Sequence, residues 1–167
     1  MTAVAHVPAV LAIRPAQQED APLLHSLMQA LARHEEAGAA LRIDLPTLRR
    51  DGFGPQPRFH VLLAEVAGSV VGYVSYTIAY SVWAGATIIA IDDLYVEPEH
   101  RGGGAGRRLM EEVRATCLRD GHGFVRWTVE LDNPRAIEFY GRLGASLRNK
   151  GVCTWRLSPD GCLGAPP

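Results

Sequence analysis

The chain has 167 residues, enough for one domain with a substantial core. Its 17 basic and 18 acidic residues give a formal net charge of −1, so no overall field favours nucleic acid or acidic lipid. Three cysteines without a C-x-x-C pair suit a reducing compartment, and neither a secretion signal nor an apolar run of ~20 residues is visible. We therefore expect a cytoplasmic protein that binds neither nucleic acid nor membrane.

The first half of the chain predicts a strand, two helices and then a hairpin. An amphipathic helix is expected from Asp20 until just before Gly38, because apolar residues recur there at three-to-four spacing. Asp44 is a good N-cap for a second helix, which we expect to end before Gly52. Runs rich in β-formers predict strands at 11–14, 59–66, 70–80 and 87–96, with a turn at 67–69.

The second half predicts a β-α-β crossover and a well-capped helix. A helix is expected at 107–119, followed by strands at 124–130, 146–149 and 152–157. Asn133 and Pro134 form an N-cap and N1 pair, and Gly144 suits the position after the helix end. The order predicts an α/β fold with a mixed, twisted central sheet flanked by helices. We expect an N-terminal extension at 1–10, one domain at 11–158 and a mobile tail at 159–167.

The most informative stretch is Val96 to Gly106, Val-Glu-Pro-Glu-His-Arg-Gly-Gly-Gly-Ala-Gly. It joins a strand end, a glycine loop and a helix start, where unpaired N–H groups at the positive end of the helix dipole favour an anion. The string lacks the spacing of a dinucleotide fingerprint and the Lys-Ser/Thr ending of a P-loop. A glycine-rich turn without a ligand is the alternative.

The form Arg-x-x-Gly-x-Gly behind a Val-x-Pro strand exit resembles the coenzyme A loop of the Gcn5-related N-acetyltransferases (GNAT). The resemblance implies a GNAT fold, acetyl-CoA as co-substrate and no metal. It also implies cofactor contacts at Leu94, Tyr95, Val96, Arg101, Gly102, Gly103, Gly104, Ala105, Gly106, Arg107, Asn133 and Tyr140.

Asp92 and Asp93 interrupt an otherwise apolar strand. Burying an ionised carboxylate without partners costs free energy, so two adjacent aspartates in an apolar strand need an explanation in structure or function. Successive strand residues face opposite sides, so only one of the two faces a pocket unless a bulge redirects both. The acids either bind substrate and remove a proton or cap local backbone N–H groups, and their setting favours the functional role for at least one.

Tyr140 lies on the helix that begins after Asn133. On spacing alone it is a core aromatic. The segment Asn-x-x-Ala-x-x-Phe-Tyr-x-x-x-Gly-Ala at 133–145 looks like the one in which the superfamily places a phenol beside the thioester sulfur. A phenol with a pKa of about 10 suits a general acid for a departing thiolate.

Seven segments between Ile13 and Leu157 are similar in order and spacing to the diamine acetyltransferases, which include the spermidine/spermine and thialysine-acetylating enzymes. The resemblance implies a homodimer, an ammonium site formed by Asp92, Asp93 and Trp83, and Tyr140 as acid. Two segments depart from the polyamine enzymes: Ser81 and Val82 stand where those enzymes carry an aspartate and a proline, and Val152, Cys153 and Thr154 stand where they carry acids. Fewer acids make a smaller amine with one reactive ammonium at least as suitable.

The sequence thus predicts an N-acetyltransferase that moves acetyl from acetyl-CoA to a primary amine of a small molecule, with proton removal by Asp92 or Asp93. A protein Nα- or lysine acetyltransferase and a non-catalytic acyl-CoA-binding protein are the alternatives. Cys117 is expected to pack in the core, and the six histidines are too scattered to predict a metal site.

Overall fold

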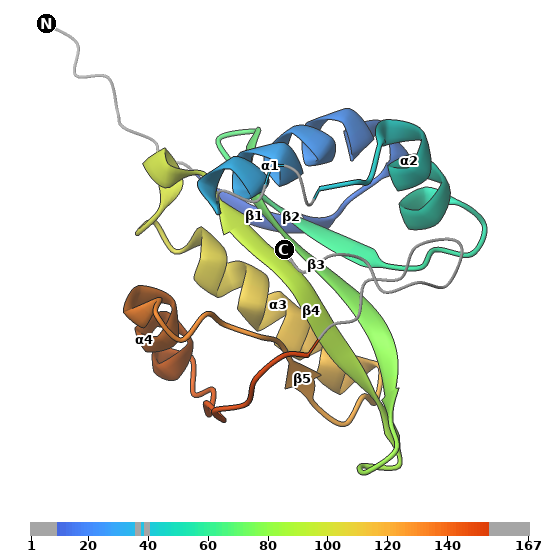
Figure 1. Cartoon of the computed structure of the whole chain (residues 1–167). Helices are drawn as coiled ribbons and strands as arrows, with labels where there is room; N and C mark the ends of the chain where they lie inside the picture. The colour runs from blue at the N-terminus through green and yellow to red at the C-terminus, as the bar shows by residue number, and fades with distance from the viewer. Residues whose placement is uncertain (1–9, 36–37, 39–40, 154–167) are drawn as a thin grey trace, which may run out of the picture. The chain divides into compact units, whose positions relative to one another are not determined.

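The computed structural model describes residues 10–35, 38 and 41–153 (Figure 1). The chain divides into two compact units, Met1–Thr128 and Val129–Pro167. In its described residues the first unit holds the sheet and helices α1 to α3, and the second holds α4. The predicted tail at 159–167 and most of the predicted extension lie outside the described residues.

The first unit is built on a five-stranded sheet in the order β1-β2-β3-β4-β5. The strands are β1 Leu11–Pro15, β2 His60–Val66, β3 Ser69–Ser81, β4 Ala86–Val96 and β5 Val125–Arg126. Neighbours from β1 to β4 are antiparallel, whereas β4 and β5 are parallel. The predicted mixed sheet is therefore confirmed, including the hairpin turn, where Ala67 and Gly68 adopt φ values of +52° and +81°.

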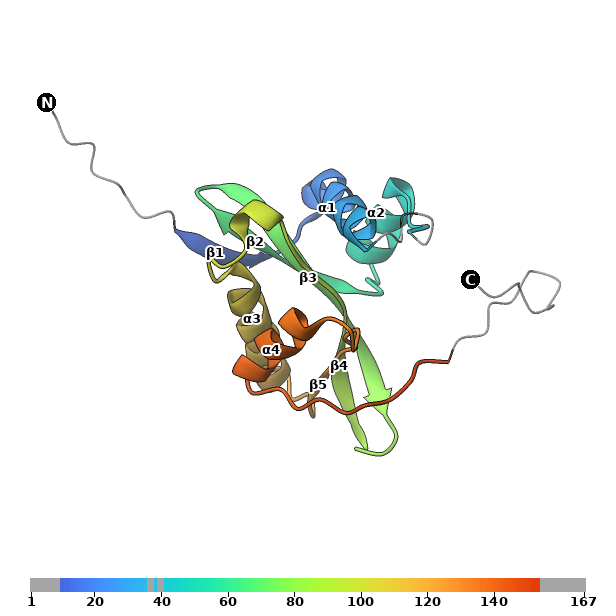
Figure 2. The ribbon, with the colours of Figure 1, turned by 60° about the vertical axis from the view of Figure 1, so that its left-hand side comes forward.

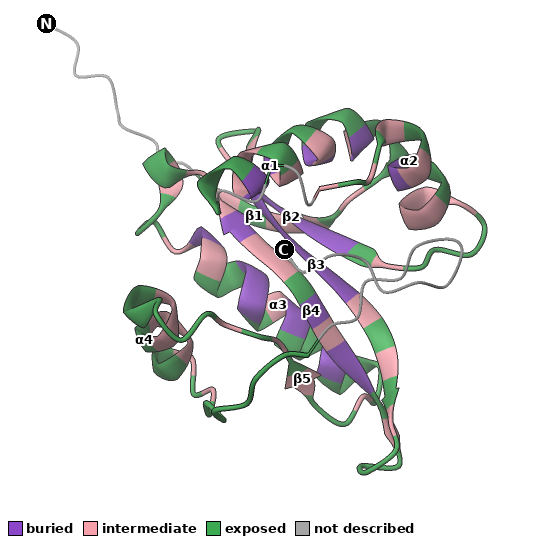
Figure 3. Cartoon of the chain, viewed as in Figure 1, coloured by how far each residue is buried: buried purple, intermediate pink, exposed green. Residues whose placement is uncertain are grey.

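Helices cover both faces of this sheet. Helices α1 (Ala21–His34) and α2 (Leu45–Phe53) lie on one face, and α3 (Ala105–Arg119) lies on the other (Figures 1 and 2). Because side chains alternate along a strand, β2 contributes to a core on each face. The core under α1 and α2 contains Ala21, Leu24, Leu27, Leu48, Val61, Leu63, Tyr73 and Tyr95. Figure 3 shows buried residues along the central strands, on α1 and α2, and on α3 on the other face.

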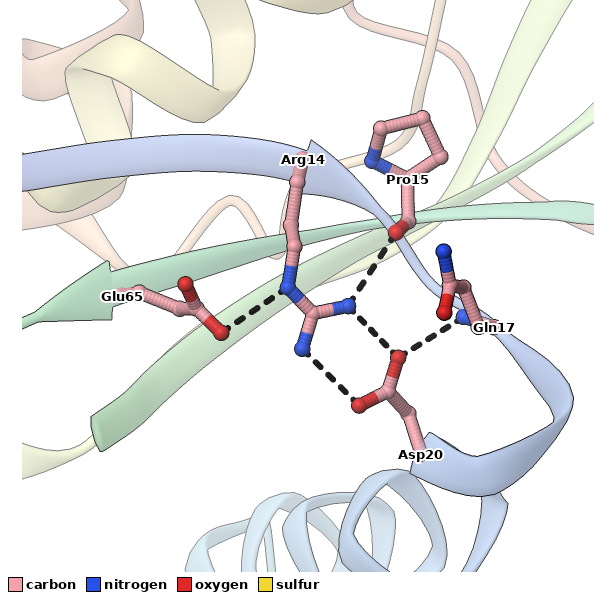
Figure 4. A network of polar contacts seen from close by, with 5 residues as sticks. All are labelled: Arg14, Pro15, Gln17, Asp20 and Glu65. Atoms are coloured by element: carbon pink, nitrogen blue, oxygen red, sulfur yellow. Dashed lines mark hydrogen bonds and ion pairs between the residues drawn. The ribbon is translucent and has the colours of Figure 1, made fainter. Parts of the chain in front are cut away.

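Arg14 connects three segments of the first unit (Figure 4). Its guanidinium donates to both oxygens of Asp20 at 2.6 and 2.9 Å and to Glu65 on β2 at 2.8 Å. Hydrogen bonding from Arg14 is the main reason that the pKa of Asp20 lies below its usual range. The Asp20 carboxylate also accepts from the backbone N–H of Gln17, so the network fixes the entry into α1.

Helix α2 begins as predicted but ends later. The Asp44 side chain accepts from the N–H of Thr47 at 2.9 Å, which confirms the N-cap. The predicted end before Gly52 is wrong, because the helix continues to Phe53. A Cβ on Gly52 would lie 2.7 Å from Cζ of Phe59, so glycine serves close packing here and does not stop the helix.

Several predicted strand boundaries are also wrong. Strand β5 spans only Val125–Arg126 because it pairs with β4 at just Ile89 and Ala90. Residues 145–153 form no strand, which overturns the prediction at 146–149, and only 152–153 of the last predicted strand are described. A β-rich sequence forms a strand only where a neighbour completes its hydrogen bonds.

In the second unit, α4 spans Pro134–Arg142. Asn133 caps it by accepting from the N–H of Ala136 at 3.0 Å. Gly144 follows the helix end with a φ of +84°, a conformation that glycine adopts without strain. Both predicted ends of this helix are confirmed.

Candidate active site

A β-bulge sets the geometry of the acid pair. Ser75 on β3 lies opposite Asp93, but the next residue, Tyr76, lies opposite Ile91. Asp92 is thus an extra residue on β4, which interrupts the alternation of faces. Both carboxylates line the same pocket as a result. A bulge was the arrangement expected to turn both acids toward one pocket, and this bulge is present.

The pocket that contains both acids has a volume of about 270 Å³. Its apolar walls come from α1, from the segment before α2, from the residue before β2 and from β2 itself: Leu24, Met28, Ile43, Phe59 and Val61. Its polar lining consists of Arg58, Tyr73, Ser75, Thr77 and the two aspartates. A small volume with apolar walls and few polar groups is typical of a site for a small molecule.

The two carboxyls differ in exposure. Asp92 is exposed and Asp93 is half-buried, so the expectation of a pair buried within the strand is wrong for Asp92. Loss of solvent raises the pKa of Asp92, and the neighbouring charge of Asp93 adds to the rise. Loss of solvent also raises the pKa of Asp93, partly offset by the Ser75 hydroxyl, which donates to its Oδ2 at 3.3 Å. Both groups are thereby more basic than ordinary aspartates.

Tyr73 brings an unsatisfied polar atom to the pocket. The side chain is fully buried, and within the described part of the chain its hydroxyl has no hydrogen-bond partner of good geometry. It is nevertheless close enough to Asp93 that hydrogen bonding from Tyr73 lowers the pKa of that carboxyl. A polar molecule in the pocket would complete the hydrogen bonding of this hydroxyl.

Sequence reasoning missed Tyr73, Ser75 and Thr77. A signal was present, because polar side chains at alternate positions of an apolar strand share one face. Arg58 was missed as well, since it precedes β2 and nothing in its own segment connects it with β4. Its place in the pocket depends on two strand pairings, β2 with β3 and β3 with β4.

The glycine loop has the geometry of an anion cradle. Gly102 and Gly104 adopt φ values of +82° and +89°, which non-glycine residues avoid. Gly104 is the N-cap of α3, and its carbonyl accepts the first helical hydrogen bond from Arg108. The predicted start at Arg107 is therefore two residues late. The N–H groups of Ala105, Gly106 and Arg107 occupy the first turn, where a helix leaves such donors unpaired.

The two arginines of the loop are engaged within the chain. Nε of Arg101 donates to the carbonyl of Val96 at 2.9 Å, and its guanidinium carbon lies 5.8 Å from the ring centre of Tyr95. Nε of Arg107 donates to Glu111 at 2.7 Å. Arg101 therefore fixes the loop against the end of β4, and Arg107 offers its backbone N–H more readily than its side chain. Gly103 lies between the two left-handed glycines and is exposed.

Strand β4 has an open edge beside the cradle. Its described partners on the β5 side stop at Ala90, so residues 91–96 have no strand neighbour there. An unpaired edge leaves backbone N–H and C=O groups available to a ligand. Leu94, Tyr95 and Val96, predicted to contact the cofactor, lie on this segment. The acids, the open edge and the loop follow one another along a single stretch of chain.

Tyr140 and Asn133 belong to the second unit. The Tyr140 ring is half-buried and meets that of Phe139 edge-on, with centroids 5.1 Å apart. Loss of solvent raises the pKa of the Tyr140 phenol, which keeps it protonated at neutral pH. The Asn133 side-chain oxygen is used as the helix cap. Their predicted contacts with the cofactor stay predictions.

Trp83 lies away from the acid pocket of its own chain. It is fully exposed at the tip of the β3–β4 hairpin. Roughly 20 Å of strand separates Ser75 from Ser81, where the hairpin turn begins. The first unit does not bring Trp83 to Asp92 and Asp93. Cys117 is buried on α3, as predicted.

The described residues contain no group of three or more histidine, cysteine, aspartate or glutamate side chains suited to a metal ion. Among the same residues, no helix is both long and apolar enough to cross a membrane.

Comparison with known proteins defines the family. The sequence pattern of the acetyltransferase (GNAT) family matches residues 23–145. A thialysine N-epsilon-acetyltransferase of Bos taurus is 36% identical over 145 residues, covering 82% of this chain and 85% of that protein. Its counterpart in Mus musculus is 36% identical, with 80% and 82% covered. The chain belongs to the GNAT acetyltransferase family and is an N-acetyltransferase.

Solved structures show the same fold. An aminoglycoside acetyltransferase from an uncultured soil metagenomic sample, crystallised with sisomicin, has a TM-score of 0.75 at 18% identity. The similarity covers 89% of this chain and 96% of that one. An integron cassette protein of V. cholerae has a TM-score of 0.71 at 23% identity, with 90% and 94% covered. The predicted GNAT fold is confirmed.

Proposed function

We propose that the chain transfers acetyl from acetyl-CoA to the primary amine of a small substrate, either a diamine or polyamine or an aminoalkyl amino acid such as thialysine. One observation carries the proposal: the bulge brings Asp92 and Asp93 into one small pocket, on the strand that leads into the glycine loop. Similarity to thialysine N-epsilon-acetyltransferases supports a small amine.

The two acids bind the substrate ammonium and convert it to a reactive amine. An alkylammonium has a pKa of about 10.4, so at neutral pH it binds as a cation that cannot attack a thioester. Two carboxylates hold the cation, and one of them takes its proton, directly or through a water. Burial raises the pKa of both carboxyls, so either is a stronger base than an ordinary aspartate; Asp93 is half-buried, while Asp92 lies nearer to solvent.

The loop residues fit the diphosphate of acetyl-CoA. The N–H groups of Ala105, Gly106 and Arg107 stand at a helix N-terminus, the usual place for such an anion. A Cβ on Gly104 would meet no heavy atom within 4 Å, so the space outside the loop is open to a ligand. The open edge at Leu94 to Val96 suits the amide groups of the pantetheine arm. Acetyl-CoA supplies the thioester that the amine attacks.

Tyr140 is proposed as the acid that protonates the departing thiolate. The proposal rests on its place in the segment that begins at Asn133 and on a pKa raised by burial, which keeps the proton on the phenol at neutral pH. A proton donor matters only when the carbon–sulfur bond breaks.

A homodimer is part of the proposal. Large apolar side chains on the β3–β4 hairpin are exposed in the single chain: Ile78, Tyr80, Val82 and Trp83. Neighbouring apolar groups of this kind mark interaction surfaces. Only in an assembly would Trp83 approach an acid pocket, that of the partner. Light scattering on the purified chain measures the mass that decides this point.

The test compares free amines with peptide amines as acceptors. Thiol release from acetyl-CoA is measured with lysine analogues, diamines and spermidine, and with peptides that present a free N-terminus or a lysine. The proposal expects turnover with small amines and little with peptides. Turnover confined to peptides would replace it with a protein acetyltransferase.

A further inference from the structure

A basic residue also lines the acid pocket. Arg58 lines it together with Asp92 and Asp93, while apolar side chains from α1 and β2 form the walls. A guanidinium beside the pocket would weaken the binding of a polycation, because like charges repel. A second charge on the substrate, opposite in sign to the ammonium, would explain it.

The Arg58 guanidinium is weakly engaged within the described chain. Its only ion pair there is with Asp51, at 3.7 Å, and its side chain is 79% exposed. That carboxylate is already held by Arg50, whose Nε and Nη2 both donate at 2.9 Å. Arg58 therefore keeps most of its donors for another acceptor, and a guanidinium binds carboxylates in a two-pronged geometry.

Strand register sets the separation of the charges. Val61 on β2 lies opposite Ser75, and Ser75 lies opposite Asp93. Two strand spacings of about 4.8 Å place Asp93 about 10 Å from Val61. Arg58 precedes Val61 on the same segment, so β3 lies between the segment of Arg58 and the strand that carries the acids. An aliphatic or thioether stem is suited to span this separation along the apolar wall.

We propose that Arg58 is a specificity-determining residue that binds a carboxylate on the substrate while Asp92 and Asp93 hold its reactive ammonium. The pocket thereby selects an amino acid with a terminal side-chain amine over a polyamine. This inference rests on the proposed function. It adds that the substrate carries a negative as well as a positive charge, and that Arg58 recognises the negative one.

The test uses two amines that differ in one group. S-(2-aminoethyl)-L-cysteine and its carboxamide have the same length and the same reactive amine, but only the first carries a carboxylate. The measured quantity is the ratio of their kcat/KM values in wild type, Arg58→Gln and Arg50→Gln. Arg50 is a matched control, because it is also exposed, also pairs with Asp51 and does not line the pocket.

Wild type and Arg50→Gln are expected to prefer the carboxylate. Arg58→Gln should lower the preference about tenfold, the effect of one hydrogen bond to a charged group in a partly screened position. Its turnover of the carboxamide and of spermidine should stay within about threefold of wild type, well below that tenfold effect. Arg58→Lys keeps the charge and should retain part of the preference.

Two results overturn the inference and leave the function standing: a wild type that turns over both amines equally, or an Arg58→Gln variant with the wild-type ratio. Absence of thiol release with every amine in wild type would instead remove the proposed function, and the inference with it. Thermal unfolding of each variant shows whether it is folded.

Discussion

The cradle is tested most sharply by a pair of glycine-to-alanine substitutions at the two ends of α3. Gly104 and Gly121 have φ values of +89° and +74°, and a Cβ on either would meet no heavy atom within 4 Å. Alanine at each position therefore introduces the same backbone strain and no clash. The left-handed conformation costs an L-residue about 1–2 kcal/mol.

Both variants should lose about 1–2 kcal/mol of unfolding free energy, because their backbone conformations match. For a chain of this size that is a drop of about 2–4 °C in Tm per kcal/mol. Only Gly104→Ala puts a methyl group where the loop is proposed to approach the diphosphate. Its affinity for acetyl-CoA should fall at least about tenfold, equivalent to 1.4 kcal/mol, while Gly121→Ala binds like wild type.

Isothermal titration calorimetry with acetyl-CoA measures the affinities, and thermal unfolding without ligand measures the stabilities. Equal affinity in the two variants, with equal loss of stability, would refute the assignment of the loop as the diphosphate site.

Three further predictions concern the acids and the phenol. Burial raises the pKa of Asp93 in the folded state, so wild-type stability falls as pH rises from the ordinary value of about 3.9 through the folded pKa. In urea unfolding, Asp93→Asn should therefore be more stable than wild type at pH ~7 but not at pH ~3. The same variant should lose most amine turnover while still binding acetyl-CoA. Unchanged turnover would mean that the carboxylate has a structural role. Ser75→Ala removes a hydrogen bond that lowers the pKa of Asp93, so the acidic limb of kcat/KM should move to higher pH; an unmoved limb contradicts this role. Tyr140→Phe should lower kcat by roughly 10²–10⁴ with little change in acetyl-CoA affinity, and a rate within threefold of wild type would return Tyr140 to a packing role.

Local signals predicted the parts of the site that depend on neighbours in sequence. The glycine loop, the caps at Asp44 and Asn133, and the left-handed Gly144 each follow from a few adjacent residues. Such features are set by backbone preferences and by hydrogen bonds within one turn. The sequence therefore indicated the cradle and both ends of α4 before any long-range contact was known.

Features that depend on pairing between distant segments were not predictable in the same way. The bulge at Asp92 is a property of the β3–β4 register, and the sequence could name it only as an alternative. Gly52 looked like a helix stop because its contact with Phe59 is not local in the helix. No strand forms at 146–149 in the part of the chain that the structure describes, and propensity cannot show whether a neighbour completes a strand's hydrogen bonds.

The central claim is that the pocket of Asp92 and Asp93 presents a small amine to acetyl-CoA. The most direct measurement incubates the purified chain with acetyl-CoA labelled in its acetyl carbonyl and with S-(2-aminoethyl)-L-cysteine, and follows the label by NMR. The account predicts that the label appears as an amide on the side-chain nitrogen, at a rate that Asp93→Asn greatly reduces and the exposed-site variant Asp132→Asn does not. Label recovered only as free acetate or in unreacted acetyl-CoA, with every small amine tried, would contradict it.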